Sequence, residues 1–120
     1  MALKEADREM VANIIQVGMR AAILLKGVII QKVNQETLDW GLREINATAI
    51  LDKYADRVTA DPEYVQLFNL LMLVSSLEGQ LDYQIREYGL DSLKDDLEEI
   101  NTSLRAAGEQ FDLSQLQKEV

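Results

Sequence analysis

The sequence predicts an all-α fold, a single four-helix bundle-like domain over residues 1–120 with a short fifth helix at the C-terminus. Apolar side chains recur at steps of three and four along most of the chain, which is typical of amphipathic helices. Proline occurs once, at Pro62, and good helix caps stand at the points where the pattern stops. The length is also sufficient to bury a core without disulfides or metals. These three observations favour one helical bundle.

The first helix is expected from about Lys4 to Lys32. The helical pattern ends before Asn34. This residue is a good N-cap for a second helix, because its side-chain oxygen can accept a hydrogen bond from a free backbone N–H. So short a connection favours an antiparallel helical hairpin. One continuous helix with a kink is the alternative.

The second helix is expected from Asn34 to about Val58, and it carries two separate apolar stripes. The first stripe consists of Leu38, Leu42, Ile45 and Ala49, and the second of Trp40, Ala47, Leu51, Tyr54 and Val58. A helix normally buries one stripe against its own bundle. Two stripes therefore predict two packing partners.

Asp61 is expected to cap the third helix, with Pro62 at the first position, where the missing N–H costs nothing. The helix should continue to about Tyr88 and end at Gly89, since glycine accepts the backbone conformation of a helix C-terminus. The expected core-facing row is Leu67, Leu70, Val74, Leu77, Leu81, Ile85 and Tyr88.

The fourth helix is expected to begin at Asp91 or Ser92 and to end after Ala107, where Gly108 stops it. Its apolar residues form one narrow stripe, so it should pack on one side only. Asp112 can cap a short fifth helix that is either docked on the bundle or frayed. The residues that would dock it are Phe111, Leu113 and Leu116.

The stretch VGMRAAILLKGVII, from Val17 to Ile30, is apolar around most of its circumference. Arg20 and Lys26 interrupt it, and no membrane span is predicted, because a span needs about 20 mainly apolar residues. An apolar surface wider than one bundle covers predicts a homodimer interface instead. The residues expected in it are Ile15, Gly18, Met19, Ala22, Lys26, Ile29 and Ile30. If the protein is a monomer, this helix must be the central one.

The net charge of −9 belongs entirely to the second half of the chain. Residues 1–60 carry eight basic and eight acidic side chains, whereas residues 61–120 carry four basic and thirteen acidic ones. A negative net charge of this size disfavours direct binding to nucleic acid or to anionic membranes. The densest part predicts an acidic corner for a basic partner, formed by Glu78, Asp82, Glu87, Asp91, Asp95, Asp96, Glu98 and Glu99. The alternative is that these carboxylates only keep the protein soluble.

The chain has neither cysteine nor histidine. Thiolate metal sites, Glu-x-x-His di-iron sites and nucleophile–histidine pairs are therefore excluded, and no catalytic residue, cofactor or metal is predicted. The enzymatic alternative is a Mg²⁺-dependent all-α nucleotide pyrophosphohydrolase. It needs carboxylate pairs on two facing helices, and only one cluster, Asp95, Asp96, Glu98 and Glu99, is dense enough to supply one.

The sequence therefore predicts a non-catalytic protein–protein interaction or regulatory module of the inhibitor, immunity, antitoxin or adaptor type. It would act as a homodimer and offer the acidic corner to a basic partner. The first ten residues, MALKEADREM, lack the regions of a signal peptide, so a cytoplasmic location is expected. The alternative is a structural or assembly subunit of a larger complex. An acidic mimic of nucleic acid is a third reading, for which one acidic corner is little support.

Overall fold

The computed structural model describes residues 4–111 and confirms an all-α, bundle-like domain. These residues contain no strand. The predicted fifth helix from Asp112, with Leu113 and Leu116, lies outside the described residues. The elements are η1 (Glu5–Asp7), α1 (Arg8–Ile29), α2 (Gln35–Ile45), α3 (Ala47–Ala60), η2 (Pro62–Tyr64), α4 (Val65–Tyr88) and α5 (Ser92–Gln110), where η marks a short 3-10 helix.

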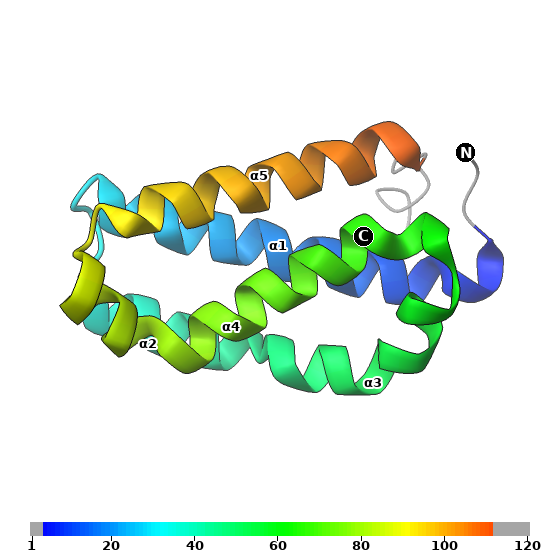
Figure 1. Ribbon diagram of the computed structural model, residues 1–120, viewed down its shortest axis with the longest axis horizontal. Helices are drawn as coiled ribbons and strands as arrows, with labels where there is room; N and C mark the ends of the chain where they lie inside the picture. Colours follow the sequence, from blue (N-terminus) through cyan, green and yellow to red (C-terminus); the bar gives the residue numbers. More distant parts are fainter. Residues whose placement is uncertain (1–3, 112–120) are drawn as a thin grey trace.

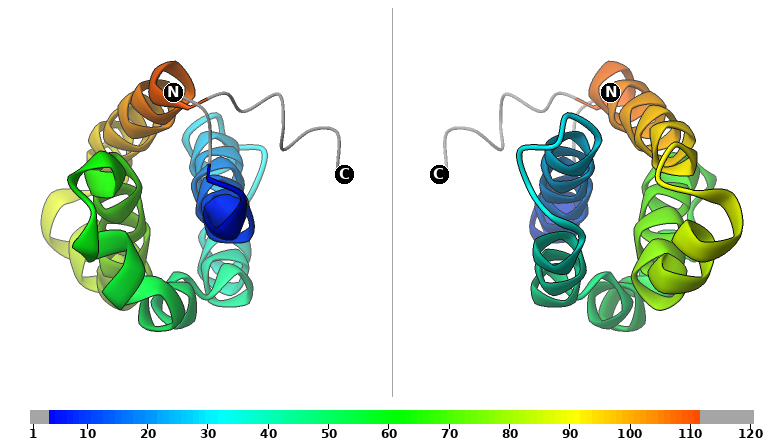
Figure 2. Two further views of the ribbon diagram at one scale, coloured as in Figure 1. Left: turned by 90° about the vertical axis from the view of Figure 1, so that its right-hand side faces the viewer. Right: turned by 90° about the vertical axis from the view of Figure 1, so that its left-hand side faces the viewer.

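The helices surround one core. α1 and α5 run side by side in opposite directions, and α4 packs against both α5 and α3 (Figure 1). Viewed from the end, the order around the bundle is α1, then α2 with α3, then α4 and α5 (Figure 2). The largest fully buried aliphatic side chains come from α1, α2, α4 and α5. They include Val11, Ile14, Leu25, Leu38, Leu42, Leu67, Leu70, Leu71, Leu93 and Ile100.

α1 and α2 form the predicted antiparallel hairpin, and the kinked continuous helix is wrong. α1 ends at Ile29, and Gln31 adopts a positive φ of 62° that turns the chain back. The side chain of Asn34 accepts a hydrogen bond from the backbone N–H of Thr37 at 2.8 Å. Asn34 is therefore the N-cap of α2, as predicted.

The single helix predicted over Asn34–Val58 is wrong, because the chain breaks at Asn46. This residue adopts the left-handed conformation, with φ 52° and ψ 57°, which asparagine tolerates better than most residues. Its side chain also accepts a hydrogen bond from the backbone N–H of Ala49 at 3.3 Å, which caps α3. One residue thus ends α2 and begins α3.

The break at Asn46 accounts for the two apolar stripes. Leu38 and Leu42 are buried in α2, and Ala47 and Val58 are buried in α3. The change of direction lets each short helix turn its own stripe toward the same core. The two stripes therefore do not require two partners. Trp40 and Ala49 are exceptions, because both are exposed, Trp40 over 65% of its surface.

α4 follows the predicted cap. The Asp61 carboxylate accepts a hydrogen bond from the backbone N–H of Glu63 at 3.0 Å, and Pro62 opens η2. Ile85 is half-buried, whereas Tyr88 is wrong as a core residue, since it stands in the last turn of α4 and is 69% exposed. The rest of the predicted row is confirmed as buried: Leu67, Leu70, Val74, Leu77 and Leu81.

α5 continues past Gly108 to Gln110, so the predicted stop after Ala107 is wrong. Phe111, directly after the helix, is buried, and its ring centre lies 5.6 Å from that of Tyr64. Gln110 donates a hydrogen bond to the backbone carbonyl of Glu63. These tertiary contacts hold the last turn and outweigh the roughly 1 kcal/mol that a glycine inside a helix costs.

Gly18 allows α1 to approach α4 and α5 closely. A Cβ atom at this position would lie 2.7 Å from Leu70 Cδ2 and 3.0 Å from Leu104 Cδ2. Gly18, which the sequence placed in a dimer interface, is therefore packed against helices of its own chain.

We expect Gly18→Ala to be less stable than Gly79→Ala by about 1–3 kcal/mol. Both replacements gain up to about 1 kcal/mol of helix propensity. Only the first adds an atom in space that Leu70 occupies, whereas nothing lies within 4 Å of a Cβ atom built at Gly79. Urea unfolding of the two variants measures the difference. Equal stabilities of the two variants would mean that the side chains of Leu70 and Leu104 rearrange without a cost in free energy.

Candidate functional site

A groove of about 600 Å³ runs between α4 and α5. Its α4 side extends from Asn69 to Gln84, about 22 Å at 1.5 Å per residue. The groove combines three apolar side chains with amides, hydroxyls and carboxylates. Its lining residues are Asn69, Met72, Leu73, Ser76, Leu77, Gln80 and Gln84 from α4 and Asp96, Glu99, Thr102 and Ser103 from α5.

The charged groups that line the α4–α5 groove are both acidic. Asp96 and Glu99 lie one turn apart on α5. The Gln84 amide donates hydrogen bonds to the Asp96 carboxylate and, at 3.0 Å, to the Ser92 hydroxyl, which holds Asp96 in place. Because no lysine or arginine among residues 4–111 lines the groove, its electrostatic potential favours a cation.

The structure does not bring all eight residues of the predicted acidic corner together. The Ser75 hydroxyl shares a hydrogen bond of 2.8 Å with Thr48 of α3, so this side of α4 faces α3. Glu78 and Asp82 follow Ser75 at steps of three and four and lie on the same side. They are therefore separated by the width of α4 from the acids of the α4–α5 groove.

The other four acids surround the junction of α4 and α5 without lining the groove. Glu87, Asp91, Asp95 and Glu98 are exposed. Asp91 lies 3.5 Å from the Lys94 ammonium, which offsets part of its charge. These residues add negative charge close to one end of the groove.

The predicted dimer interface is also divided. Four of its seven residues are buried or partly buried in the bundle, namely Ile15, Gly18, Ala22 and Ile29. The other three are exposed, namely Met19, Lys26 and Ile30. Ile23, which the sequence prediction missed, is 69% exposed. The same three- and four-residue steps could have found it, because Met19, Ile23, Lys26 and Ile30 form one row along α1.

A second groove, of about 270 Å³, lies between α1 and α2. Gly41 brings α2 against Leu24, since a Cβ atom added there would lie 2.6 Å from Leu24 Cδ1. Trp40 precedes Gly41 in α2 and lies one helical turn from Glu44, so it is a neighbour of two residues that line this groove. The lining residues of the α1–α2 groove are Arg20, Ile23, Leu24, Gly41, Glu44 and Ile45.

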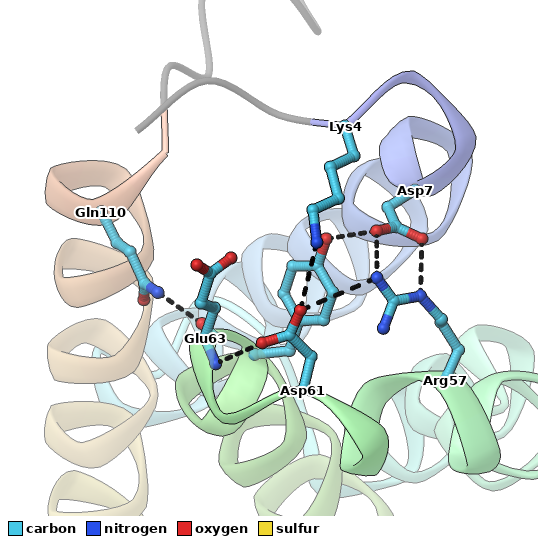
Figure 3. Close-up of polar contacts among 7 residues, drawn as sticks. Lys4, Asp7, Arg57, Asp61, Glu63 and Gln110 are labelled. Carbon is cyan, nitrogen blue, oxygen red and sulfur yellow. Dashed lines mark hydrogen bonds and ion pairs between the residues drawn. The ribbon is translucent and has the colours of Figure 1, made fainter.

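Five residues form a polar network, here called the clasp, that joins η1 to the end of α3 and to η2 (Figure 3). The buried Asp7 carboxylate accepts hydrogen bonds from Arg57 Nε at 2.9 Å and Nη2 at 2.6 Å, and a third from the Tyr64 hydroxyl. The Arg57 guanidinium carbon lies 5.0 Å from the centre of the Tyr64 ring. Asp61 lies 3.4 Å from the Lys4 ammonium and 3.8 Å from Arg57.

Neighbouring groups shift the ionisation of the clasp. The hydrogen bonds from Arg57 hold the pKa of Asp7 below its ordinary value, although burial alone would raise it. The pKa of Tyr64 is raised mainly by burial and, to a smaller extent, by the hydrogen bond that its hydroxyl donates to Asp7. The backbone N–H of Glu63 lowers the pKa of Asp61. At neutral pH the clasp thus contains charged acceptors and a neutral phenol donor, which suits a structural contact rather than proton transfer.

Neither a metal site nor a membrane span is established. Within residues 4–111, no group of three or more acidic side chains is placed to hold a metal ion, and this includes the cluster from Asp95 to Glu99. In the same residues one helical stretch, Glu5–Ile29, is long and apolar enough to cross a membrane by length and composition. The core helix of a bundle meets the same criterion, and α1 packs against α2, α4 and α5.

No protein-family model, curated protein or solved structure matches this chain.

Proposed function

We propose that the protein is a non-catalytic interaction module that binds a basic, amphipathic helix of a partner protein in the α4–α5 groove. The observation that carries this proposal is the lining of the groove, which, in the part of the chain that the structure describes, holds Asp96 and Glu99 and no basic residue. A lysine or arginine that enters the groove is attracted by both carboxylates. Asp96 is partly buried, so its charge is screened less by salt and water than the charge of the exposed Glu99.

The length of the groove suits a helix that lies along it. A length of about 22 Å corresponds to about four helical turns. Met72, Leu73 and Leu77 offer contacts to apolar residues spaced three and four apart on the partner, which is how amphipathic helices dock between two helices. The basic residues of the partner would then lie beside its apolar row, within reach of the α5 carboxylates.

The acids outside the groove contribute to the rate of binding. Glu87, Asp91, Asp95 and Glu98 are exposed around the start of α5. A field of one sign at the mouth of a groove attracts an oppositely charged partner and raises its association rate, an effect that salt suppresses. Such steering fits an inhibitor, immunity protein, antitoxin or adaptor.

Removing both groove carboxylates is the direct test. The double variant Asp96→Asn/Glu99→Gln should weaken binding of a labelled amphipathic Lys/Leu helix of about 18 residues by about tenfold at low salt, which is about 1.4 kcal/mol. Fluorescence anisotropy measures the affinity. Raising the salt concentration should reduce the difference between this variant and the wild type.

The matched control is Asp91→Asn/Glu98→Gln, which removes the same charge from residues that do not line the groove. It should slow association but change the dissociation rate little, because rim charges act mainly on the encounter. If both double variants weaken binding equally, net charge and not the groove attracts the peptide, and the proposal fails.

The second candidate is a structural or assembly subunit, favoured by the exposed apolar residues of α1 and α2. Met19, Ile23, Ile30 and Trp40 are each more than half exposed. Apolar contacts persist at high salt, whereas charge-steered ones weaken. Capture of partners from the native host at low and at high salt therefore separates the two functions.

A further inference from the structure

Trp40 is the single tryptophan of the chain, and 65% of its surface is exposed on α2. Tryptophan is strongly enriched among the residues that contribute most to binding at protein interfaces. Three exposed apolar side chains follow one row along the neighbouring helix, namely Met19 and Ile23 of α1 and Ile30 directly after its last residue. This face therefore leaves a large indole and a row of aliphatic groups uncovered.

The α1–α2 groove lies beside Trp40 but is not filled by it. Trp40 is absent from the lining, whose apolar side chains are those of Ile23, Leu24 and Ile45. A cavity of about 150 Å³ can hold benzene, so a groove of about 270 Å³ has room for an indole ring. A projecting ring and a recess of matching size thus lie side by side on one face.

We propose that two copies of this protein pair through this face, with Trp40 of each copy inserted into the α1–α2 groove of the other. A two-fold axis brings each projection to the recess of the partner, because both belong to the same patch of surface. Met19, Ile23 and Ile30 then surround the two indoles and keep water from them. Lys26, in the same row of α1, lies at the edge with its alkyl stem on apolar surface.

Charge also favours a second copy as the occupant. The groove is bordered by Arg20 and Glu44, one cation and one anion, so a two-fold axis can set Arg20 of one copy against Glu44 of the other. Residues 1–60, which include both helices of this face, carry equal numbers of basic and acidic side chains. Two copies can therefore pair through this face without bringing their two acidic halves close together.

This pairing is independent of the proposed partner groove. In the end view, the α1–α2 side and the α4–α5 side lie on opposite sides of the bundle (Figure 2). A dimer formed through Trp40 leaves both α4–α5 grooves open, so the pair presents two partner sites. Either proposal can fail without the other.

The single tryptophan provides a direct readout. As the protein concentration rises from about 0.5 to 50 µM, a range that spans micromolar dissociation constants, the fluorescence of Trp40 should shift to the blue and acrylamide quenching should fall. Light scattering should show a monomer-to-dimer transition over the same range. Trp40→Ala should raise the dissociation constant of the dimer about thirtyfold or more, as the loss of a central tryptophan does.

A variant of the recess tests the pairing while Trp40 stays in place. Ile23→Glu should abolish the concentration dependence of Trp40 fluorescence and leave the helical circular dichroism unchanged, because Ile23 is a surface residue. Tyr88→Ala is the control, since it removes an aromatic side chain that is equally exposed but lies at the end of α4. It should leave the dissociation constant unchanged.

Three results would overturn the proposal. The first is a protein that stays monomeric up to about 50 µM while the fluorescence of Trp40 does not change with concentration. The second is a blue shift that appears only when vesicles of neutral phospholipid are added, which would assign the face to a lipid surface. A dimer that Trp40→Ala and Ile23→Glu leave intact would likewise place the interface elsewhere.

Discussion

Leu81→Ala is expected to lower the free energy of unfolding by about 2–5 kcal/mol. Leu81 is 2% exposed and belongs to the α4 row that faces the core. The substitution removes buried methyl groups and leaves a cavity that a close-packed bundle closes only in part. Leu77→Ala should cost less than Leu81→Ala, because Leu77 also lines the α4–α5 groove, where the surface can relax into the space.

Denaturant unfolding followed by circular dichroism measures both losses, and Leu90→Ala is the matched control. The same three carbon atoms are removed there, but Leu90 is 48% exposed beside the turn between α4 and α5. We expect a loss below about 1 kcal/mol at Leu90, in keeping with a half-exposed site. A similar loss at Leu81 would place that residue outside the core.

The features of the fold that could be predicted from the sequence are the ones that local chemistry decides. Asn34 and Asp61 cap helices because their side-chain oxygens reach backbone N–H groups two or three residues ahead. Leu67 to Leu81 repeat with the helical period, and the core lies on the side that this period indicates. Both signals are contained within a few neighbouring residues.

The features that could not be predicted depend on distant residues or on a choice between two local states. Asn46 can stay inside a helix or cap the next one, and its left-handed conformation depends on where α3 packs. Gly108 stays helical because Phe111 is anchored on Tyr64, which is far away in the sequence. Tertiary contacts outweigh local propensity at both positions.

The candidate sites also combine features that the local sequence decides with features that depend on how whole helices pack. Counting charges correctly located the acidic half of the chain, but a count does not say which side of α4 each carboxylate occupies. Asp96 and Glu99 line one groove, whereas Glu78 lies on the α3 side. Similarly, the breadth of apolar surface on α1 does not distinguish Gly18, which is enclosed by its own bundle, from Met19, which is exposed. Those assignments need the packing of whole helices.

Asp7→Ala is expected to lower the free energy of unfolding by about 3 kcal/mol at neutral pH, although no sequence pattern links Asp7 to its partners. The substitution leaves the buried Tyr64 hydroxyl without its acceptor and removes both hydrogen bonds from Arg57. An unpaired buried donor costs more than the bond itself contributes. Thermal and urea unfolding at pH 7 measure the effect. Asp52→Asn, which neutralises an exposed carboxylate of α3, should change stability little.

The stability conferred by Asp7 should depend on pH in one direction. Its pKa is lower in the folded protein than the ordinary value of 3.8, because Arg57 and Tyr64 hydrogen-bond to the carboxylate. The charged form is therefore favoured by folding, and the contribution is complete above the ordinary value and lost as the pH falls through the folded pKa. The difference between the wild type and Asp7→Ala should shrink as the pH is lowered below about 4. A difference that stays constant from pH 7 down to acid would show that the Asp7 charge does not hold the clasp together.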